Sequence, residues 1–462
     1  LKLLQERLDI MGRLFGTDGA RGVAITELTC ETAMQIGKAA ALVLTKHKPA
    51  GSKAKILIGK DTRVSSDILE AALMAGIMSV GADVELLGTV PTPAVAYLVR
   101  YYDADAGVMI SASHNSVEYN GIKLFSSSGF KLPDEVENEI EALILDNPDQ
   151  ISLCSGAAVG RVTRRETAAD DYVRHLVSTG STAIKPIKIL ADCANGSASV
   201  TARDLFTRLN VDFDIVNAEP DGCNINEKCG STHIDLLCDR VRDGGYDLGV
   251  AFDGDADRCL AVDEKGNIVC GDKLIAILAK NMRDNGRLRG DTAVVTVMSN
   301  LGFHTYMKNN SLNTVCTVVG DRYVLEEMLK NGYNIGGEQS GHIIFLDYAT
   351  TGDGQLTAVQ LIELLAQTGR TLSELTANIP DYPQILKNIR ITEDKRGMWN
   401  KSADILAAIG EAEQSLGENG RILVRESGTE PLVRVMIEGK NADEVEKWTN
   451  AISAAVEKAL CI

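Results

Sequence analysis

Apolar and polar positions follow the same plan three times along this chain. Residues 55–88, 188–217 and 292–320 each begin with a continuous apolar run, pass through a polar loop into a segment of helical period, and end in a second apolar run. Each stretch has the length of a β-α-β unit, and strands joined by a crossover helix lie parallel. The pattern therefore predicts an α/β fold, whether the units are repeated domains or parts of one larger sheet.

Polar or proline-containing stretches interrupt this plan at residues 146–150, 263–273 and 379–385. After the third, the order of elements changes to a strand, a helix, two strands and a terminal helix that begins at Ala442, which is typical of a small α+β domain. We therefore expect four domains, with limits good to about ten residues. They cover residues 11–158, 159–264, 265–380 and 381–462.

Charge and cysteine content narrow the classes of partner. The formal net charge of −17 disfavours nucleic acid, and an anionic substrate would need its own local arginines and lysines. The ten cysteines form no Cys-x-x-Cys pair and have no histidine cluster beside them, so they predict reduced thiols in a cytoplasmic protein. No apolar run approaches the ~20 residues of a membrane span. Residues 1–10 lack the features of a secretory signal, and Met11 is the expected natural start.

Residues 107–125 begin as a buried strand and then turn abruptly polar. A Ser-His-Asn-Ser run at 113–116 follows the strand, and an Asn-Gly pair restores an apolar run that contains Lys123. Loops of small polar residues are usually plain surface turns. The alternative is a nucleophile held at the end of a strand, with Ser113 as the reacting group.

Three carboxylates follow another apolar strand in the stretch LGVAFDGDADR, residues 248–258, as Asp253, Asp255 and Asp257. Alternate side chains of extended backbone point to one side, so these carboxylates converge and raise one another's pKa unless a cation compensates them. An oxygen-only ligand set suits Mg²⁺ best. A calcium EF-hand also begins Asp-x-Asp-x-Asp, but Arg258 stands where that loop has its turn glycine, and strands flank the motif. A solvated acidic turn is the other alternative.

A glycine-rich turn at residues 334–345 carries Glu338, Ser340 and His342 after a strand-like run. Glycines let a ligand approach the backbone, and a carboxylate beside a hydroxyl suits sugar hydroxyls. A turn that needs flexible backbone explains the composition equally well.

A second polar turn, residues 424–435, has the features of a phosphate site. Successive amides of a glycine-containing turn form an anion nest, hydroxyls add donors, and arginines add bidentate charge. Basic residues beside a turn are also often only solvated. The residues concerned are Arg425, Ser427, Gly428, Thr429 and Arg434.

Two loops near the start add further cations. Residues 11–22 bring Arg13 and Arg21 among four glycines, and residues 59–66 place Lys60 and Arg63 before a helix, whose N-terminus favours anions. Ordinary loop chemistry explains either one alone. Taken with the other motifs, they suggest a cleft rich in phosphate-binding groups.

Taken in order, FGTDGARG, SASHN…NGIK, DGDADR, GGEQSGH and RESGTEPLVRV resemble the motifs of the α-D-phosphohexomutase superfamily, from Met11 almost to the C-terminus. The resemblance implies three similar α/β domains with mixed sheets and a smaller C-terminal α+β domain, arranged around a central cleft. It also implies phosphoryl transfer between O1 and O6 of a hexose phosphate. The first, fourth and fifth motifs are most similar to the branch that acts on glucosamine phosphates. The branch that acts on mannose or glucose phosphates is the alternative.

The resemblance implies a role for each motif. Ser113 is expected to be carried as phosphoserine, and one of its phosphoryl oxygens to bind Mg²⁺ together with Asp253, Asp255 and Asp257. The expected proton carriers are Lys123 and His342, and the expected stabilisers of the transferring group are Arg21 and Arg258. Sugar hydroxyls are assigned to Glu338 and Ser340, and the non-reacting phosphate to Arg425, Ser427, Gly428, Thr429 and Arg434.

The same resemblance implies three partners. They are a phosphosugar substrate, a glucosamine 1,6-bisphosphate or similar primer, and a second copy of the chain in a homodimer. We expect contact with neither nucleic acid nor membrane. The product is expected to enter amino-sugar nucleotide synthesis.

Two positions depart from the superfamily pattern. Ser116 stands where proline is usual, which leaves the segment after the nucleophile without a fixed φ. Lys60 stands where arginine is common, which keeps charge but loses bidentate contact. A sugar-phosphate-binding protein without turnover is a further alternative, and the presence of Ser113, Lys123 and the three aspartates argues against it.

Overall fold

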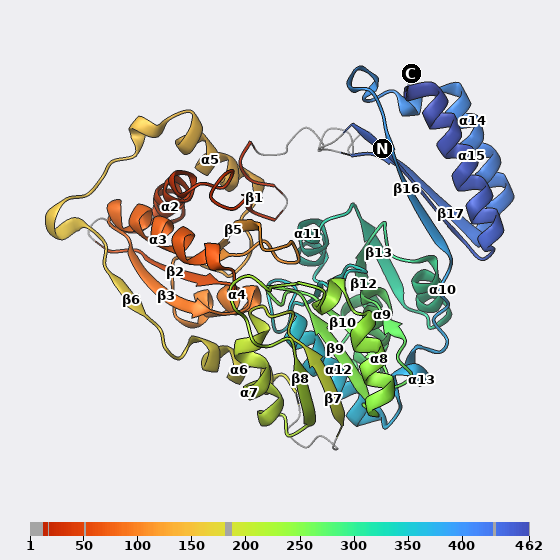
Figure 1. Ribbon diagram of the computed structural model, residues 1–462, viewed down its shortest axis with the longest axis horizontal. Coiled ribbons are helices and arrows are strands. Elements are labelled where there is room, and N and C mark those ends of the chain that lie inside the picture. The colour runs from red at the N-terminus through yellow and green to blue at the C-terminus, as the bar shows by residue number, and fades with distance from the viewer. Residues whose placement is uncertain (1–12, 17, 50–51, 181–186, 428–430, 462) are drawn as a thin grey trace. The chain divides into compact units, whose positions relative to one another are not determined.

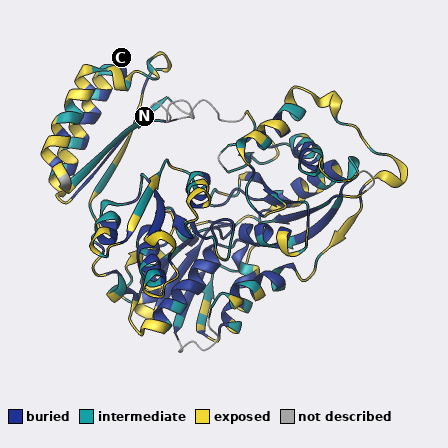
Figure 2. Cartoon of the chain, turned by 180° about the vertical axis from the view of Figure 1, so that it is seen from behind, coloured by how far each residue is buried: buried dark blue, intermediate teal, exposed yellow. Residues whose placement is uncertain are grey.

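The computed structural model describes residues 13–16, 18–49, 52–180, 187–427 and 431–461 (Figure 1). Within them the chain forms two compact units. The larger spans residues 13–298 and 312–377, and the smaller spans residues 299–311 and 378–461. Figure 2 shows buried residues concentrated in the interior of the larger unit. No helix among the described residues is both long and apolar enough to span a bilayer.

The first sheet of the larger unit has six strands in the order β1-β5-β4-β2-β3-β6. Strands β2, β3, β4 and β6 are parallel; β5 pairs antiparallel with β4, and β1 pairs antiparallel with β5. The strands are β1 (Ala20–Val23), β2 (Lys55–Lys60), β3 (Asp83–Thr89), β4 (Ala106–Ile110), β5 (Tyr119–Ser126) and β6 (Val162–Arg164). The helices are α2 (Cys30–Thr45), α3 (Val64–Ser79), α4 (Thr92–Tyr101) and α5 (Asp134–Leu145).

Side-chain size decides how these helices lie on the sheet. One face presents Ile56, Ile58 and Val108 to a core shared with α2 and α3. On the other face Gly59 and Gly107 leave room for α4, because a Cβ at either position would come within 2.9 Å of Val95. The sheet is therefore buried on both faces, as continuous apolar strands predict.

The second sheet repeats this arrangement in the order β11-β10-β9-β7-β8, and the third in the order β13-β12-β14-β15. The second contains β7 (Lys188–Asp192), β8 (Asp212–Val216), β9 (Leu248–Phe252), β10 (Cys259–Asp263) and β11 (Ile268–Val269), with helices α6 (Ala168–Ser178), α7 (Ala198–Arg208) and α8 (Asp235–Gly244). The third contains β12 (Thr292–Thr296), β13 (Asn313–Thr317), β14 (Ile335–Gly337) and β15 (Ile343–Phe345), with helices α9 (Gly271–Asp284), α11 (Asp321–Asn331), α12 (Gly354–Thr368) and α13 (Leu372–Thr376).

All three sheets share one local device. In each, a strand of the parallel set is followed by an antiparallel partner, which gives the hairpins β4–β5, β9–β10 and β14–β15. The loop of each hairpin lies at the carboxyl end of a parallel strand, where α/β sheets bind ligands. These three loops contain the Ser113, Asp253 and Glu338 motifs respectively.

The smaller unit is an antiparallel sheet in the order β16-β18-β17, covered by two helices. Its elements are β16 (Gln384–Arg390), α14 (Ala403–Leu416), β17 (Gly420–Glu426), β18 (Leu432–Gly439) and α15 (Ala442–Leu460), and α10 (Leu301–Asn309) belongs to the same unit. Buried Glu438 of β18 accepts from the Leu301 N–H at the start of α10 and from Arg421 at 2.7 Å. These contacts attach α10 to this unit.

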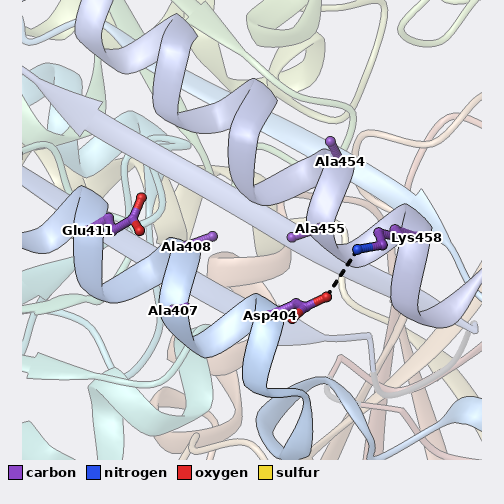
Figure 3. Close-up of a pocket in the computed structure, with 7 residues that line it drawn as sticks. All are labelled: Asp404, Ala407, Ala408, Glu411, Ala454, Ala455 and Lys458. Atoms are coloured by element: carbon purple, nitrogen blue, oxygen red, sulfur yellow. Dashed lines mark hydrogen bonds and ion pairs between the residues drawn. The ribbon is translucent and has the colours of Figure 1, made fainter.

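A groove of about 430 Å³ between α14 and α15 is lined by four alanines, Glu411 and an Asp404–Lys458 pair (Figure 3). The pair is 3.3 Å apart and both side chains are more than 60% exposed, at 66% and 76%. Such an exposed ion pair contributes little to stability.

The predicted fold class is confirmed in its three α/β sheets of mixed direction and its smaller α+β unit. Each predicted β-α-β stretch forms a parallel strand pair. Strand β6 joins the first sheet, so that sheet extends a few residues past the predicted limit at 158. The four domain limits and the central cleft stay predictions.

Close packing of α2 against α3 depends on two glycines. A Cβ at Gly76 would lie 2.2 Å from the Met34 carbonyl oxygen, and one at Gly37 would lie 2.6 Å from that of Leu73. We expect Gly76→Ala to lower the free energy of unfolding by about 1–3 kcal/mol, because backbone cannot move aside as a side-chain end can. Gly410→Ala, in α14 with nothing within 4 Å, is expected to stabilise by about 0.5–1 kcal/mol. Scanning calorimetry measures both, and a Gly76→Ala protein as stable as the parent would contradict the packing.

Candidate active site

Ser113 lies at the end of buried strand β4 and is itself only 1% exposed. Its φ of 53° is left-handed, a conformation that is uncommon for a residue with a Cβ. In this conformation its hydroxyl donates to Asp253 Oδ2 at 2.6 Å. The first hairpin loop thus places its serine against the carboxylates of the second loop, which are the candidate metal ligands and are called the metal-type carboxylates below.

Asp253, Asp255 and Asp257 follow β9 as an alternating set, and their ligand oxygens lie within 4.8 Å of one another. Thr92 at the start of α4 donates its hydroxyl to Asp255 Oδ2 at 2.6 Å and its N–H to the Asp255 carbonyl at 2.9 Å. Gly254 has no room for a side chain, since its Cβ would lie 2.6 Å from the Ser113 carbonyl oxygen. The first and second hairpin loops are therefore in backbone contact.

The electrostatics of this cluster fit a hard divalent cation. Burial raises the pKa of Asp253, and the charges of Asp257 and Asp255 raise it further. Asp255 Oδ1 and Asp257 Oδ1 are buried and have no hydrogen-bond partner among the described residues. Oxygen-only donors with unused lone pairs are what Mg²⁺ requires. The residues present therefore fit Mg²⁺.

Lys123 of β5 contacts two of the same carboxylates. Its Nζ is 2.8 Å from Asp255 Oδ2, 3.4 Å from Asp257 Oδ2 and 3.0 Å from Asp18 Oδ2. Burial lowers the pKa of Lys123, but the three carboxylates outweigh burial and hold that pKa above its ordinary value. The lysine is charged in this arrangement, and neutralising the carboxylates would bring its pKa down.

His342, the last residue of the third hairpin loop before β15, is buried against Asp257. The Gly352 N–H donates to His342 Nε2 at 3.1 Å, which assigns the proton of the neutral ring to Nδ1, 3.6 Å from Asp257 Oδ2. Burial lowers the pKa of His342, but Asp257 and Asp321 raise it overall. The structure thus brings this predicted proton carrier to a metal-type carboxylate.

Arg21 and Arg258 both lie close enough to the serine loop for their charges to act on His114. Arg258 donates its backbone N–H to Asp253 Oδ1 at 3.1 Å, and Arg21 pairs with Asp18. Burial, then Arg258, then Arg21 lower the pKa of His114 to about 4, so this ring is neutral at pH 7. Its Nδ1 lies 3.4 Å from the Ser113 hydroxyl.

Glu338 and Ser340 form the third hairpin loop. Glu338 Oε1 accepts the Gly320 N–H at 3.2 Å, burial raises its pKa, and Ser340 is exposed. Gly341 has a φ of 92°, which suits glycine and turns the chain between the two strands. Glu338 and Ser340 are therefore more accessible to solvent than the buried serine, aspartates, lysine and histidine described above.

Arg425 and Arg434 lie directly opposite each other on β17 and β18 in the smaller unit. Burial and the charge of Arg434 lower the pKa of Arg425, so two like charges face each other where an anion would relieve them. Ser427 donates its N–H to the Leu432 carbonyl at 2.8 Å. Gly428 and Thr429 lie outside the described residues.

Three cations proposed as phosphate binders have other partners in the structure. Arg13 pairs with Asp146, and Lys60 Nζ lies 2.8 Å from Asp67 Oδ1 and 2.6 Å from Glu70 Oε2. Arg63 is fully buried on Asp61 at 2.8 Å. The phosphate-binding hypothesis for Arg63 is wrong, because its guanidinium is not exposed to solvent and binds carboxylate and backbone carbonyl oxygens.

Several residues that shape the site were not assigned from sequence. Lys131 Nζ lies 2.5 Å from Asp18 Oδ1 and also contacts Asp321, which in turn lies 3.4 Å from His342 Nε2. Asp18 sits in the FGTDGARG motif, so its polarity was a usable signal. Lys131 and Thr92 carry none, because their contacts come from segments far away in sequence.

Comparison with known proteins adds three findings. Models of phosphoglucomutase/phosphomannomutase α/β/α domains I, II and III match residues 12–150, 170–266 and 270–382, and the model of the C-terminal domain matches residues 386–455. The phosphoglucosamine mutase of Clostridium novyi is 52% identical over 450 residues, which cover 97% of this chain and 99% of that protein.

Solved structures are similar in fold. A phosphoglucomutase/phosphomannomutase family protein from Burkholderia thailandensis has a TM-score of 0.81 at 22% identity, covering 98% of this chain and 100% of that one. The Aspergillus fumigatus N-acetylphosphoglucosamine mutase, in complex with GlcNAc-6P and magnesium, has a TM-score of 0.67 at 19% identity and covers 96% of both chains.

The carboxylate cluster predicts a stabilising effect of Mg²⁺. At a concentration about 100 times its Kd, a ligand of the native state stabilises by about 2.7 kcal/mol, so we expect Mg²⁺ to raise the melting temperature. Asp255→Asn is expected to lose most of this rise. Asp263→Asn changes a buried carboxylate at the other end of β10, where it accepts from Lys265 and Asn267, and is expected to keep the rise. An undiminished rise in Asp255→Asn would exclude the site.

Proposed function

Because the chain belongs to the phosphoglucomutase/phosphomannomutase family, we propose that it interconverts glucosamine 6-phosphate and glucosamine 1-phosphate with Ser113 as the phosphoryl carrier. The observation that carries this proposal is the Ser113 hydroxyl, 2.6 Å from Asp253 within the buried carboxylate cluster. The identity of 52% to a phosphoglucosamine mutase over nearly the full length supports the choice of amino sugar.

In the proposed reaction Ser113 begins as phosphoserine. The O1 oxygen of glucosamine 6-phosphate bonds to phosphorus while the bond from phosphorus to Ser113 Oγ breaks, and the O1 proton passes to a base of the protein. Ser113 Oγ takes up a proton as it leaves, and the resulting 1,6-bisphosphate turns over. Ser113 Oγ then gives up this proton and bonds to the phosphorus of the 6-phosphoryl group while the bond from phosphorus to O6 breaks. O6 takes up a proton from an acid of the protein, and glucosamine 1-phosphate leaves. No net oxidant, reductant or water is needed.

The main task of the site is to compensate the negative charge at the reacting phosphoryl group. A phosphoseryl group carries about −1.5 to −2 charge, beside three carboxylates. A Mg²⁺ ion held by Asp253, Asp255 and Asp257 would neutralise this charge and polarise the phosphoryl oxygens. Arg21 and Arg258, whose charges both act on His114 of the serine loop, would stabilise the charge that moves during transfer.

Proton transfer is assigned to Lys123, with His342 as the second candidate. Lys123 touches two of the metal-type carboxylates, so its pKa depends on how far those charges are compensated. His342 reaches the site through Asp257. Compensation of the carboxylate charges would therefore lower the pKa of Lys123 and make its proton easier to transfer.

Substrate contacts complete the proposal. Glu338 and Ser340 would hold sugar hydroxyls. The opposed Arg425 and Arg434, with Ser427, Gly428 and Thr429, would hold the phosphate that is not reacting. Since both ends of a bisphosphate are phosphates, such a division lets the intermediate bind in either orientation.

The setting of the enzyme is also proposed. None of the ten cysteines, all of which lie among the described residues, takes part in a disulfide, which supports a reducing, cytoplasmic location. A bisphosphate primer and a homodimer are part of the same proposal, as is the supply of amino-sugar nucleotide synthesis.

Product analysis separates this proposal from its alternatives. With Mg²⁺ and a bisphosphate primer, we expect kcat/KM for glucosamine 6-phosphate to exceed that for glucose 6-phosphate or mannose 6-phosphate by at least about tenfold, which is about 1.4 kcal/mol of discrimination. Phosphorus NMR identifies the products. A preference for glucose or mannose phosphates would favour the sister mutases, and binding without turnover would leave a non-catalytic protein.

Replacing the carrier tests the chemistry. Ser113→Ala is expected to lose mutase turnover even when bisphosphate is supplied, because no Oγ remains to accept the phosphoryl group. Ser126→Ala, a serine at the far end of the same hairpin, is the matched control and should keep wild-type kcat. Turnover by Ser113→Ala would remove Ser113 as the carrier.

A further inference from the structure

The conformation of Ser113 is held from both sides of its peptide by one buried assembly. Its N–H donates to Ser111 Oγ at 2.9 Å, and the Ser111 hydroxyl donates to Asp61 Oδ2 at 2.7 Å. Its carbonyl accepts from Arg63 Nη2 at 3.0 Å and from Asn226 Nδ2 at 2.9 Å. A left-handed serine persists only where its surroundings over-determine it, and these contacts do so.

Arg63 devotes its guanidinium to this purpose. Nε donates to Asp61 Oδ2 at 2.8 Å, Nη1 donates to the Ser116 carbonyl, and Nη2 donates to the carbonyls of Ser113 and Asn115. Four of the five N–H groups that an arginine carries are thereby committed. The side chains of Arg63 and Asp61 are both fully buried, so neither can reach a substrate.

Asn226 contacts the same loop from the segment between β8 and α8, in the part of the chain that forms the second sheet. Its Nδ2 donates to the carbonyls of Ser113 and Asn115, at 2.9 and 3.0 Å, while its Oδ1 has no partner among the described residues. The two side chains therefore bind the same pair of carbonyls from different segments of the chain. Only the N–H groups of Asn226 contribute to the hold.

We propose that Arg63, fixed on Asp61, and Asn226 are positioning residues that lock Ser113 in its left-handed conformation and aim its Oγ at the carboxylate cluster. The inference rests on the proposed function of Ser113 as phosphoryl carrier. It also explains how Ser116 can replace the usual proline, because Arg63 binds the Ser116 carbonyl and restrains the segment that a proline would stiffen.

Kinetics of two variants test this proposal. Asn226→Ala removes the donor from both carbonyls, and Arg63→Lys keeps a charge beside Asp61 but loses the planar fork. For each we expect kcat to fall about 100-fold, since a displacement of about 1 Å at a reacting group has that effect, with KM changed less than about threefold. Asn334→Ala is the control. It removes a buried asparagine that immediately precedes β14, at the end of the strand away from the third hairpin loop, and that donates to Asp347 Oδ2 at 2.7 Å. This variant is expected to lose stability and keep its kcat.

A crystal structure of Asn226→Ala gives a readout that does not depend on the substrate. We expect Ser113 to leave the left-handed region and its Oγ to move away from Asp253. Lower melting temperature with unchanged kcat, or an unmoved Ser113, would overturn the proposal. If Arg63→Lys fails to fold, Asn226→Ala decides. A wild-type enzyme inactive on glucosamine 6-phosphate would contradict the proposed function instead, and the position of Ser113 would still test the inference.

Discussion

The structure depends on how three buried carboxylates are tolerated at the end of β9. Like charges this close raise one another's pKa, and burial removes the water that would screen them. Lys123 compensates part of this charge, and Asp255 Oδ1 and Asp257 Oδ1, which accept no hydrogen bond within the described part of the chain, are available to a cation. The same negative cluster attracts the Ser113 hydroxyl, so charge compensation and placement of the nucleophile are one problem.

Repetition of the β-hairpin at the edge of each parallel set explains how the parts meet. Each hairpin turns at the carboxyl end of a buried strand, which is where α/β sheets bind ligands. The first supplies a serine and a lysine, the second the carboxylates, and the third a histidine that contacts Asp257. Glycines at 254 and 341 permit the close turns that such loops need.

Sequence reasoning succeeded where chemistry follows directly from a local pattern. The apolar runs before Ser113 and Asp253 marked them as strand ends, and alternation predicted that the three carboxylates converge. The predicted order of strands and helices in the C-terminal unit, and the start of its last helix at Ala442, also agree with the structure. These features depend on neighbours along the chain.

It failed where a side chain's partner lies far away in sequence. Arg63 looked like a phosphate binder because it precedes a helix, yet its guanidinium holds carbonyls 50 residues or more away. Thr92, Lys131 and Asp321 gave no local signal, since each has a partner in a part of the chain that forms another sheet. The local sequence around a residue cannot predict such contacts, because they form only when distant segments of the chain are brought together by the fold.

The central claim is that phosphorylated Ser113 and the three aspartates share one cation. The most direct measurement is electron-nuclear double resonance on the enzyme with Mn²⁺ in place of Mg²⁺. The phosphorylated enzyme should show a ³¹P coupling to the manganese that disappears after dephosphorylation, with the manganese retained. Bound manganese without any ³¹P coupling in the phosphorylated enzyme would contradict the account.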